Sequence, residues 1–437
     1  MKISLVSDFG TNASSLSLIT RKLYLELGKM MNREKSFTVA ATNYSTVGIG
    51  NVNQHFDCVD IPNMGGCNFP VESILSSKNL FVGLVGIDEV VLGQDAFMTL
   101  AHWKRNKSII NEQVRKWKTK NHQISHIHAS TVSDKNQFIE YLDIPEEKIE
   151  IIPYGVDHEL YTSCPAELKH IVKDKICSRF FLKPAPYFIH ISEKNFARKN
   201  VLRLFEAFGK AKATGIPHNL LVIGKNDDLI YEKAREIPGI VMLGYLSEQL
   251  MVNVIQGSEA LILPSRHEGF GFPLVDCMAC GIPSITSNVF SPPEIAQDSG
   301  LFVDPNNTDD ICEKILSFVH NKKLQEELSQ NALKRSQDFS WSSTAEKLLE
   351  YFKKNTEKQL DSNFETDYDV AARRTIVTVC SINKFLRSGA PVSDLLAFDY
   401  RKLIRWCLEV GLEDDKVKDF LIPLKNWLQK EDQSNGF

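Results

Sequence analysis

The feature that most constrains the fold is an alternation of short apolar runs with helix-like segments, which occurs twice along the 437-residue chain. In the first half the apolar runs are KISLVS, FTVAAT, FVGLVG and IEIIPYG, and they are separated by segments such as ASSLSLITRKLYLELGKMM and SDKNQFIEYL. The second half has YFIHIS, NLLVIG, IVMLG, EALILPS, GIPSITS and GLFVDP. Apolar strands that alternate with helices are typical of parallel sheets covered on both faces. The sequence therefore predicts two doubly wound α/β domains.

The alternation restarts after residues 165–186, which predicts domains over 1–175 and 176–340 with a ligand cleft between them, at the carboxyl ends of the strands. From residue 357 the chain becomes polar and acidic and then shows only helical periodicity. We therefore expect a helical extension over 357–437. Its apolar stripes fit ordinary helix packing or a surface for a partner or a membrane.

Composition and charge exclude several classes of protein. With 43% hydrophobic and 24% charged residues and a net charge of −4, the chain is ordinary globular protein, so we expect no nucleic-acid partner. The sequence has no apolar run long enough to predict a transmembrane helix, and the opening MKISLVSDFG does not fit a signal peptide. The nine cysteines show no zinc-type spacing, and Cys277 and Cys280 fit small buried residues. A cytoplasmic protein with reduced thiols follows, and contact with the inner face of a membrane stays open.

The stretch RHEGFGFPLVDCMACGIP follows the apolar run EALILPS. Gly269 and Gly271 predict a flexible loop, Pro273 suits the first position of a helix, and Gly281 suits its end. The amino terminus of such a helix, at the mouth of a parallel sheet, favours an anion such as a diphosphate.

Two carboxylates frame this loop. Glu268 precedes it, and Asp276 is expected in the first turn of the predicted helix, close to the same mouth. One carboxylate could bind hydroxyls on each side of a bound diphosphate, which matches the shape of a sugar nucleotide. Plain helix architecture is the alternative interpretation.

Arg198 and Lys199 follow the strand-like YFIHIS and would stabilise a leaving diphosphate, unless they are only a solvated helix start. In the first domain, Gly10 and Thr11 follow the first strand, where backbone approaches a ligand closely. The dinucleotide fingerprint G-x-G-x-x-G is absent, because GIGNVN ends in Asn and precedes no clear helix, so a dehydrogenase is not favoured.

Taken together, these segments resemble the retaining GT-B glycosyltransferases of the group 1 type, family GT4. EGFGFPLVDCMACGIPSITSN resembles the E-x7-E element of that family, with Asp in place of the second Glu. The resemblance covers residues 1–356 and extends to the segments IEIIPYGVDHELY, YFIHISEKNFARKNVLRLFEAF, VMLGYLSEQLMVNVIQGSEALILPS, SPPEIAQDSGLFVDP and FSWSSTAEKLLEYFKK. It implies that residues 341–356 form a helix that crosses back to the N-terminal domain.

The resemblance also implies roles for individual residues. Lys194 would act as a point charge where the family often has an arginine, and His102, taken to follow an apolar strand in FMTLAHWKR, would lie near the sugar. His126 and His128 are weaker candidates, and His190 is expected in the core. The predicted site comprises Glu268 and His102 at the sugar; Arg198, Lys199, Lys194, Phe270, Gly271 and Phe272 at the diphosphate; Asp276, Gly244, Tyr245 and Leu246 at the ribose and base; Gly10 and Thr11 on the acceptor side; and Gly269 and Glu294 in the surrounding loops.

The predicted function is transfer of a hexose from GDP-mannose or a UDP-hexose to a glycan or lipid-linked acceptor, with retention of configuration and without a metal or other cofactor. The combination of RKN with EGFGFP resembles mannosyltransferase-type members most. Two alternatives stay open: a catalytically weak subunit that binds sugar nucleotides as a scaffold, and a GT-B sugar-nucleotide epimerase or hydrolase.

Overall fold

The computed structural model describes residues 1–7, 15–43, 56–65, 67–70, 79–96, 99–192 and 196–356. Met1–Ser7 and Ile19–Asn355 form one compact unit, and Asp8–Leu18 with Thr356–Phe437 form another. The predicted extension over 357–437 lies outside the described residues. In the part of the chain that is described, no helix is long and apolar enough to cross a membrane.

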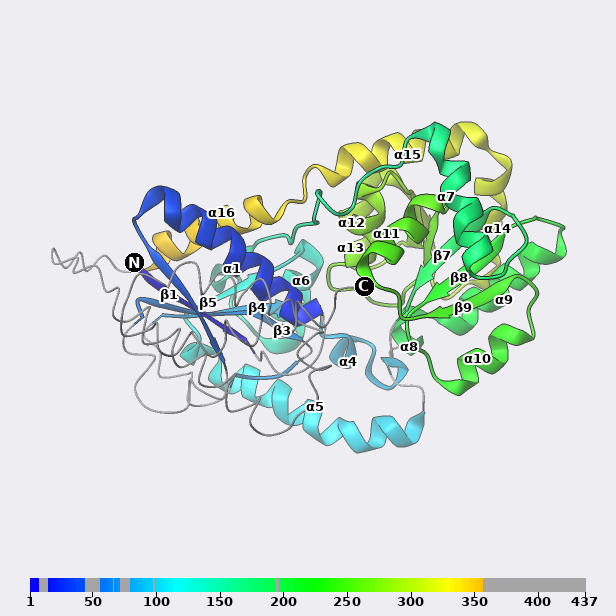
Figure 1. Cartoon of the computed structure of the whole chain (residues 1–437). Helices are drawn as coiled ribbons and strands as arrows, with labels where there is room; N and C mark the ends of the chain where they lie inside the picture. Colours follow the sequence, from blue (N-terminus) through cyan, green and yellow to red (C-terminus); the bar gives the residue numbers. More distant parts are fainter. Residues whose placement is uncertain are drawn as a thin grey trace, which may run out of the picture. The chain divides into compact units, whose positions relative to one another are not determined.

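The first sheet has six parallel strands in the order β2-β1-β3-β4-β5-β6. Figure 1 labels four of them, β1, β3, β4 and β5. The strands are β1 (Lys2–Ser7), β2 (Thr38–Asn43), β3 (Cys58–Gly65), β4 (Leu80–Val85), β5 (His126–Ala129) and β6 (Ile149–Ile151). The accompanying helices are α1 (Ser15–Glu34), α4 (Asp88–Val91), α5 (Leu100–Lys120) and α6 (Val132–Leu142). The sequence predicted four of these strands, and β3 and β5 were missed.

A buried polar pair explains why β3 and β5 lack an apolar signature. Asp60 Oδ1 of β3 lies 3.1 Å from His128 Nε2 of β5, and both side chains are buried. The pair passes over Gly83 of the intervening β4, where a Cβ would lie 2.5 Å from His128 Cε1. His128 is therefore placed inside the sheet, as a partner of Asp60.

The second sheet is also parallel, in the order β12-β11-β10-β7-β8-β9, and all six of its strands were predicted. They are β7 (Tyr187–Ile191), β8 (Asn219–Ile223), β9 (Ile240–Gly244), β10 (Leu261–Leu263), β11 (Ser284–Ser287) and β12 (Gly300–Val303). The helices are α7 (Ala166–Arg179), α8 (Phe196–Lys199), α9 (Val201–Ala213), α10 (Asp228–Arg235), α11 (Glu248–Gly257), α12 (Phe272–Ala279), α13 (Ser291–Ala296), α14 (Thr308–His320) and α15 (Lys322–Ser336). The strand order reverses between β7 and β10, which is where sheets of this kind bind ligands.

The last described helix, α16 (Trp341–Asn355), packs against the first sheet. Tyr351 Oη lies 3.0 Å from Lys148 O and 3.2 Å from Ile127 O and donates to these carbonyls. The Phe352 ring lies 4.8 Å from the Phe81 ring of β4. A helix that follows the second sheet in sequence thus completes the core of the first.

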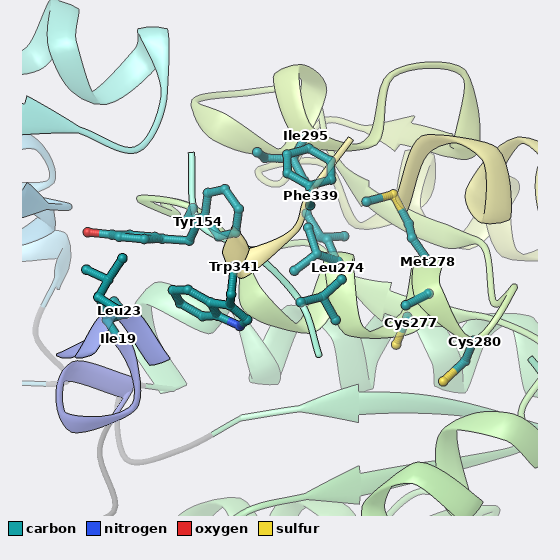
Figure 2. Packing of buried hydrophobic residues seen from close by; sticks show 14 of the residues in the cluster. Ile19, Leu23, Tyr154, Leu274, Cys277, Met278, Cys280, Ile295, Phe339 and Trp341 are labelled. Atoms are coloured by element: carbon teal, nitrogen blue, oxygen red, sulfur yellow. The ribbon is translucent and has the colours of Figure 1, made fainter. Parts of the chain in front are cut away.

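One apolar cluster connects β1 and α1 with the loop before α12 and with α12 itself. Figure 2 shows Tyr154 between Leu23 of α1 and Trp341 of α16. The Phe272 ring stacks on Tyr154 with their centroids 5.6 Å apart. This packing fixes the start of α12 from the side of the first sheet.

Candidate functional site

The loop between β10 and α12 is shaped by two glycines. Gly271 has φ +91° at the start of α12, a conformation that side chains with a Cβ rarely adopt. A Cβ on Gly269 would lie 2.8 Å from the backbone nitrogen of Gly86, which follows β4. The loop therefore packs against the end of the first sheet, and Glu268 begins it at the ligand-binding edge of the second sheet.

Glu268 is bound by two cations from α8. Its Oε1 lies 2.6 Å from Lys199 Nζ and its Oε2 lies 2.8 Å from Arg198 Nη1, with only 4% of the glutamate exposed. Burial alone would raise the pKa of the Glu268 carboxyl, but Lys199 and then Arg198 outweigh burial and hold this pKa far below its usual range. Glu268 is therefore an ionised acceptor that two positive charges surround.

Asn200 sets the position of both cations. Its φ of +62° ends the short α8 directly after Lys199 and begins α9. Asn200 Nδ2 donates to Pro264 O at 2.9 Å and to Pro305 O at 2.6 Å, so α8 is tied to the end of β10. Sequence reasoning missed this residue, although an Asn between two helical segments is a signal for the left-handed conformation.

Carboxylates from the first half also face the cations. Asp88 Oδ2, at the start of α4, lies 3.6 Å from Arg198 Nε. Burial raises the pKa of the adjacent Glu89, and repulsion from Asp88 adds to this rise. Arg198 thus lies between acids from both halves of the unit, an arrangement that sequence spacing did not indicate.

Three further contacts join the two halves around the loop. Glu294 of α13 accepts hydrogen bonds from the backbone nitrogens of residues 132 and 133, at 2.9 and 3.3 Å, and so caps the start of α6. Thr131 Oγ1 donates to Gly269 O at 3.2 Å. Burial lowers the pKa of His267 to about 4, and its neutral ring lies with Nε2 2.7 Å from Gln137 Oε1.

Asp276 lies in a different electrostatic environment, on α12. The prediction that it lies in the first turn was wrong, because α12 already begins at Phe272 and its first turn contains no acid. Burial and then the charges of Asp157 and Glu248 raise its pKa to about 8. Of these acids, Asp157 is paired with Lys22 of α1. The second acid of the E-x7-D element is therefore mostly protonated at neutral pH and can donate a hydrogen bond.

The predicted base-side residues lie at the end of β9. Gly244 has φ +68°, and its carbonyl accepts a hydrogen bond of 2.8 Å from the nitrogen of Gly224, which follows β8. The next residue, Tyr245, is 59% exposed, and Leu246 is half-buried. This turn places an aromatic ring at the same edge of the sheet as Glu268.

The predicted placement of His102 was wrong. His102 of the segment FMTLAHWKR does not lie at the end of a strand. Helix α5 begins at Leu100, and His102 lies exposed in its first turn. Thr99 caps this helix by accepting a hydrogen bond from His102 N at 3.1 Å, and Ile110 and Trp117 are buried seven residues apart on one face. Lys194, Gly10 and Thr11 lie outside the described residues. His190 is buried in β7, as predicted.

Comparison with known proteins agrees with this geometry. Residues 175–335 match the family described as Glycosyl transferases group 1. Over these residues the chain matches the group 1 glycosyltransferases. The matching part contains α8, the Glu268 loop, α12 and α13, so the predicted family is confirmed on the segment that carries the cations and both acids.

Curated relatives of this chain match it over part of their length. The O-antigen chain mannosyltransferase B of Escherichia coli is 26% identical over 232 residues, which is 51% of this chain and 59% of that protein. An uncharacterized glycosyltransferase of Methanocaldococcus jannaschii is 34% identical over 134 residues, which is 29% of this chain and 38% of that protein. The chain thus spans less than two thirds of the length of these relatives.

Solved structures match more of the chain. A glycosyltransferase from Rickettsia africae has a TM-score of 0.59 with 16% identity and covers 82% of this chain and 99% of that one. Anabaena HepE, solved in complex with UDP and glucose, has a TM-score of 0.61 with 14% identity and covers 81% and 100%. At these identities the likeness concerns the fold, and it confirms the predicted GT-B architecture of two Rossmann-like domains.

Proposed function

We propose that this glycosyltransferase moves a hexose from a nucleoside diphosphate sugar to a glycan or lipid-linked acceptor, with retention at the anomeric carbon. The observation that carries the proposal is the buried Glu268 between Lys199 and Arg198, beside the start of α12. A carboxylate, two cations and free helix amides are the groups that a sugar, a diphosphate and their leaving charge require.

In the proposed complex the donor exchanges partners with the site. Arg198 and Lys199, with the amides of residues 270–272, bind the diphosphate, and Glu268 turns its oxygens to the sugar hydroxyls. As the bond to the anomeric carbon breaks, charge grows on the departing phosphate oxygen, and the two cations stabilise that charge more than they stabilise the bound donor. The phosphate oxygen then accepts the proton of the attacking hydroxyl on the same face of the sugar. We propose no metal in this step, because side chains supply the positive charge.

Asp276 and the turn at Gly244 are assigned to the nucleoside. A protonated Asp276 would donate a hydrogen bond to a ribose oxygen, and Tyr245 would lie along the base. These roles follow from the family element and from the positions of both segments at one edge of the second sheet. The roles of His102, Lys194, Gly10 and Thr11 stay predictions.

GDP-mannose is the first donor to test, because several curated relatives are mannosyltransferases, including the serotype-specific mannosyltransferase WbdA of Escherichia coli, which is 26% identical over 251 residues. UDP-glucose is the second, because HepE was solved with it.

The deciding experiment measures release of nucleoside diphosphate from GDP-, UDP- and ADP-sugars, with a crude glycolipid fraction as acceptor. Wild type is compared with Glu268→Gln and Lys199→Ala, and Glu236→Gln, an exposed residue of the same half, is the matched control. Release from one donor that both site variants lose and the control retains supports the proposal. Binding of a donor without release, with acceptor present, would favour the scaffold alternative. Release without any glycosylated product would favour a hydrolase or epimerase.

A further inference from the structure

Helix α7 ends in a motif that normally requires glycine. The nitrogen of Leu182 donates to Cys177 O at 2.8 Å, and the nitrogen of Phe181 donates to Ser178 O at 3.1 Å. These two bonds define a Schellman ending, in which the residue at the position of Phe181 takes the left-handed conformation. Phe181 does so with φ +56°, which is strained for a residue with a Cβ.

Folding gains nothing from an aromatic residue at this position. Phe181 is 97% exposed, so its ring buries almost no apolar area in the protein. A glycine would satisfy both backbone bonds without strain. The residue is thus unfavourable for the backbone and unused by the core, which points to a contact outside the described part of the chain.

The surroundings of Phe181 are apolar and basic. A shallow depression of the surface contains Phe181, Ile171, Lys175 and Arg179, together with Asp174 and two other polar residues of α7. Leu168, one turn before Ile171 on the same side of α7, is 48% exposed, and Ile171 is 41% exposed. We call Leu168, Ile171, Lys175, Arg179 and Phe181 the α7 patch.

The α7 patch faces outward because the other side of the helix is occupied. Ile176 and Cys177 are buried, and the backbone of Lys173 lies 3.3 Å from the position that a Cβ on Gly257 of α11 would take. Beyond the end of the helix Lys183 is exposed as well. Lys175 and Arg179 therefore line the same depression as the exposed ring, with Asp174 as the acid there, and Lys183 follows the ring two residues later in the chain.

We propose that the α7 patch docks on an anionic lipid surface. Phe181 would insert at the level of the headgroups, Ile171 and Leu168 would lie against the interface, and Lys175, Arg179 and Lys183 would reach headgroup phosphates. Aromatic and aliphatic residues beside Lys and Arg are the chemistry of interfacial binding, and the excess of cations in the patch fits an anionic surface. The inference adds a location to the proposed transferase, because a lipid-linked acceptor is presented at such a surface.

The test is co-sedimentation of the full chain with vesicles of phosphatidylcholine alone or with about 30% phosphatidylglycerol, an anionic content at which basic segments bind. We expect binding to the anionic vesicles, weaker binding to the neutral ones, and weakening by salt because the charges are exposed. Phe181→Gly is the decisive variant. It should lower vesicle binding about tenfold while its Tm rises by a few degrees, since glycine relieves the left-handed strain.

Matched variants separate the patch from general surface effects. Lys175→Gln with Arg179→Gln should weaken binding to anionic vesicles, whereas Lys322→Gln with Lys323→Gln, an exposed pair on α15, should not. Leu229 of α10 is an apolar residue about as exposed as Leu168 and Ile171, and Leu229→Ala should leave vesicle binding unchanged.

Three results would overturn the proposal: no sedimentation of wild type with anionic vesicles, equal binding by Phe181→Gly, or a dimer in solution that Phe181→Gly dissolves. The last would identify the patch as a contact between copies of the chain. Sedimentation is measured without a sugar donor, so it stands or falls independently of the proposed transferase. Donor turnover with a water-soluble acceptor should be the same in Phe181→Gly and wild type.

Discussion

The two acids of the E-x7-D element lie on one loop and one helix, yet their environments are opposite. Glu268 is held by Lys199 and Arg198, and its pKa lies far below the usual range. Asp276 faces Asp157 and Glu248, and its pKa is raised to about 8. The charge state of each acid is thus set by segments remote in sequence, and one element supplies both an acceptor and a donor of hydrogen bonds.

The largest effect is expected from breaking the cationic side. Glu268→Gln removes the carboxylate that neutralises the buried Lys199 and Arg198, although Asp88 stays 3.6 Å from Arg198 Nε, and it should lower the free energy of unfolding by about 3–5 kcal/mol. It should also reduce nucleoside diphosphate release by about a hundredfold or more. Chemical denaturation and the release assay measure the two effects.

The pH dependence gives a second check on Glu268. Its folded pKa is lowered, so its contribution to stability is present above the unfolded pKa, about 4.5, and is lost as the pH falls further. The difference in free energy of unfolding between wild type and Glu268→Gln should therefore shrink below that pH. Glu236→Gln is the control. If Glu268→Gln lowers the free energy of unfolding no more than Glu236→Gln does, the stabilising role of the ion pairs of Glu268 is contradicted.

A smaller effect should follow from loosening the cations without removing them. Asn200→Ala removes three side-chain hydrogen bonds and places an alanine at φ +62°, where its methyl group makes no local hydrogen bond to offset the strain. The change should cost about 2 kcal/mol of stability. The KM for the donor should rise, because Arg198 and Lys199 lose their fixed position. Arg203→Gln, which removes a cation beside Asn200, is the control, and a donor KM changed as much by it would assign the effect to charge.

Asp276→Asn should act in the opposite direction from Glu268→Gln. Because the folded pKa of Asp276 is raised, wild type loses stability as the pH rises from about 4 to about 8, and the asparagine variant does not. The variant should therefore gain on wild type by about 1 kcal/mol between pH 5 and 8.5, a value reduced for partial exposure. Thermal melts at several pH values test this, with the exposed Asp174→Asn as control. A stability difference between Asp276→Asn and wild type that does not change with pH would contradict the raised pKa of Asp276.

The smallest expected effect is that of metal removal. If Arg198 and Lys199 neutralise the diphosphate, EDTA should change the rate of donor turnover by less than about twofold. Added Mg²⁺ after EDTA treatment is the control. A rate that falls with EDTA and returns with Mg²⁺ would show that the cations do not suffice.

The sequence predicted the second sheet better than the first for a physical reason. Five of the six strands of the second sheet contain a run of at least three apolar residues, whereas β3 and β5 contain Asp60 and His128, whose buried pairing only the folded sheet reveals. His102 was misplaced because an apolar stretch before a capping Thr99 resembles a strand when read alone. The contacts of Glu268 with Lys199, of Arg198 with Asp88 and of Glu294 with the start of α6 join distant segments, and spacing along a chain does not encode such meetings.

The position of α16 has a consequence for how the protein is made. The first sheet is complete in sequence at Ile151, but Tyr351 and Phe352, which close its core beside Phe81, are synthesised only after the whole second sheet. The N-terminal half therefore leaves the ribosome with an apolar face still uncovered. This face is covered only when α16 has been synthesised, so the first half completes its core after the second sheet has been made.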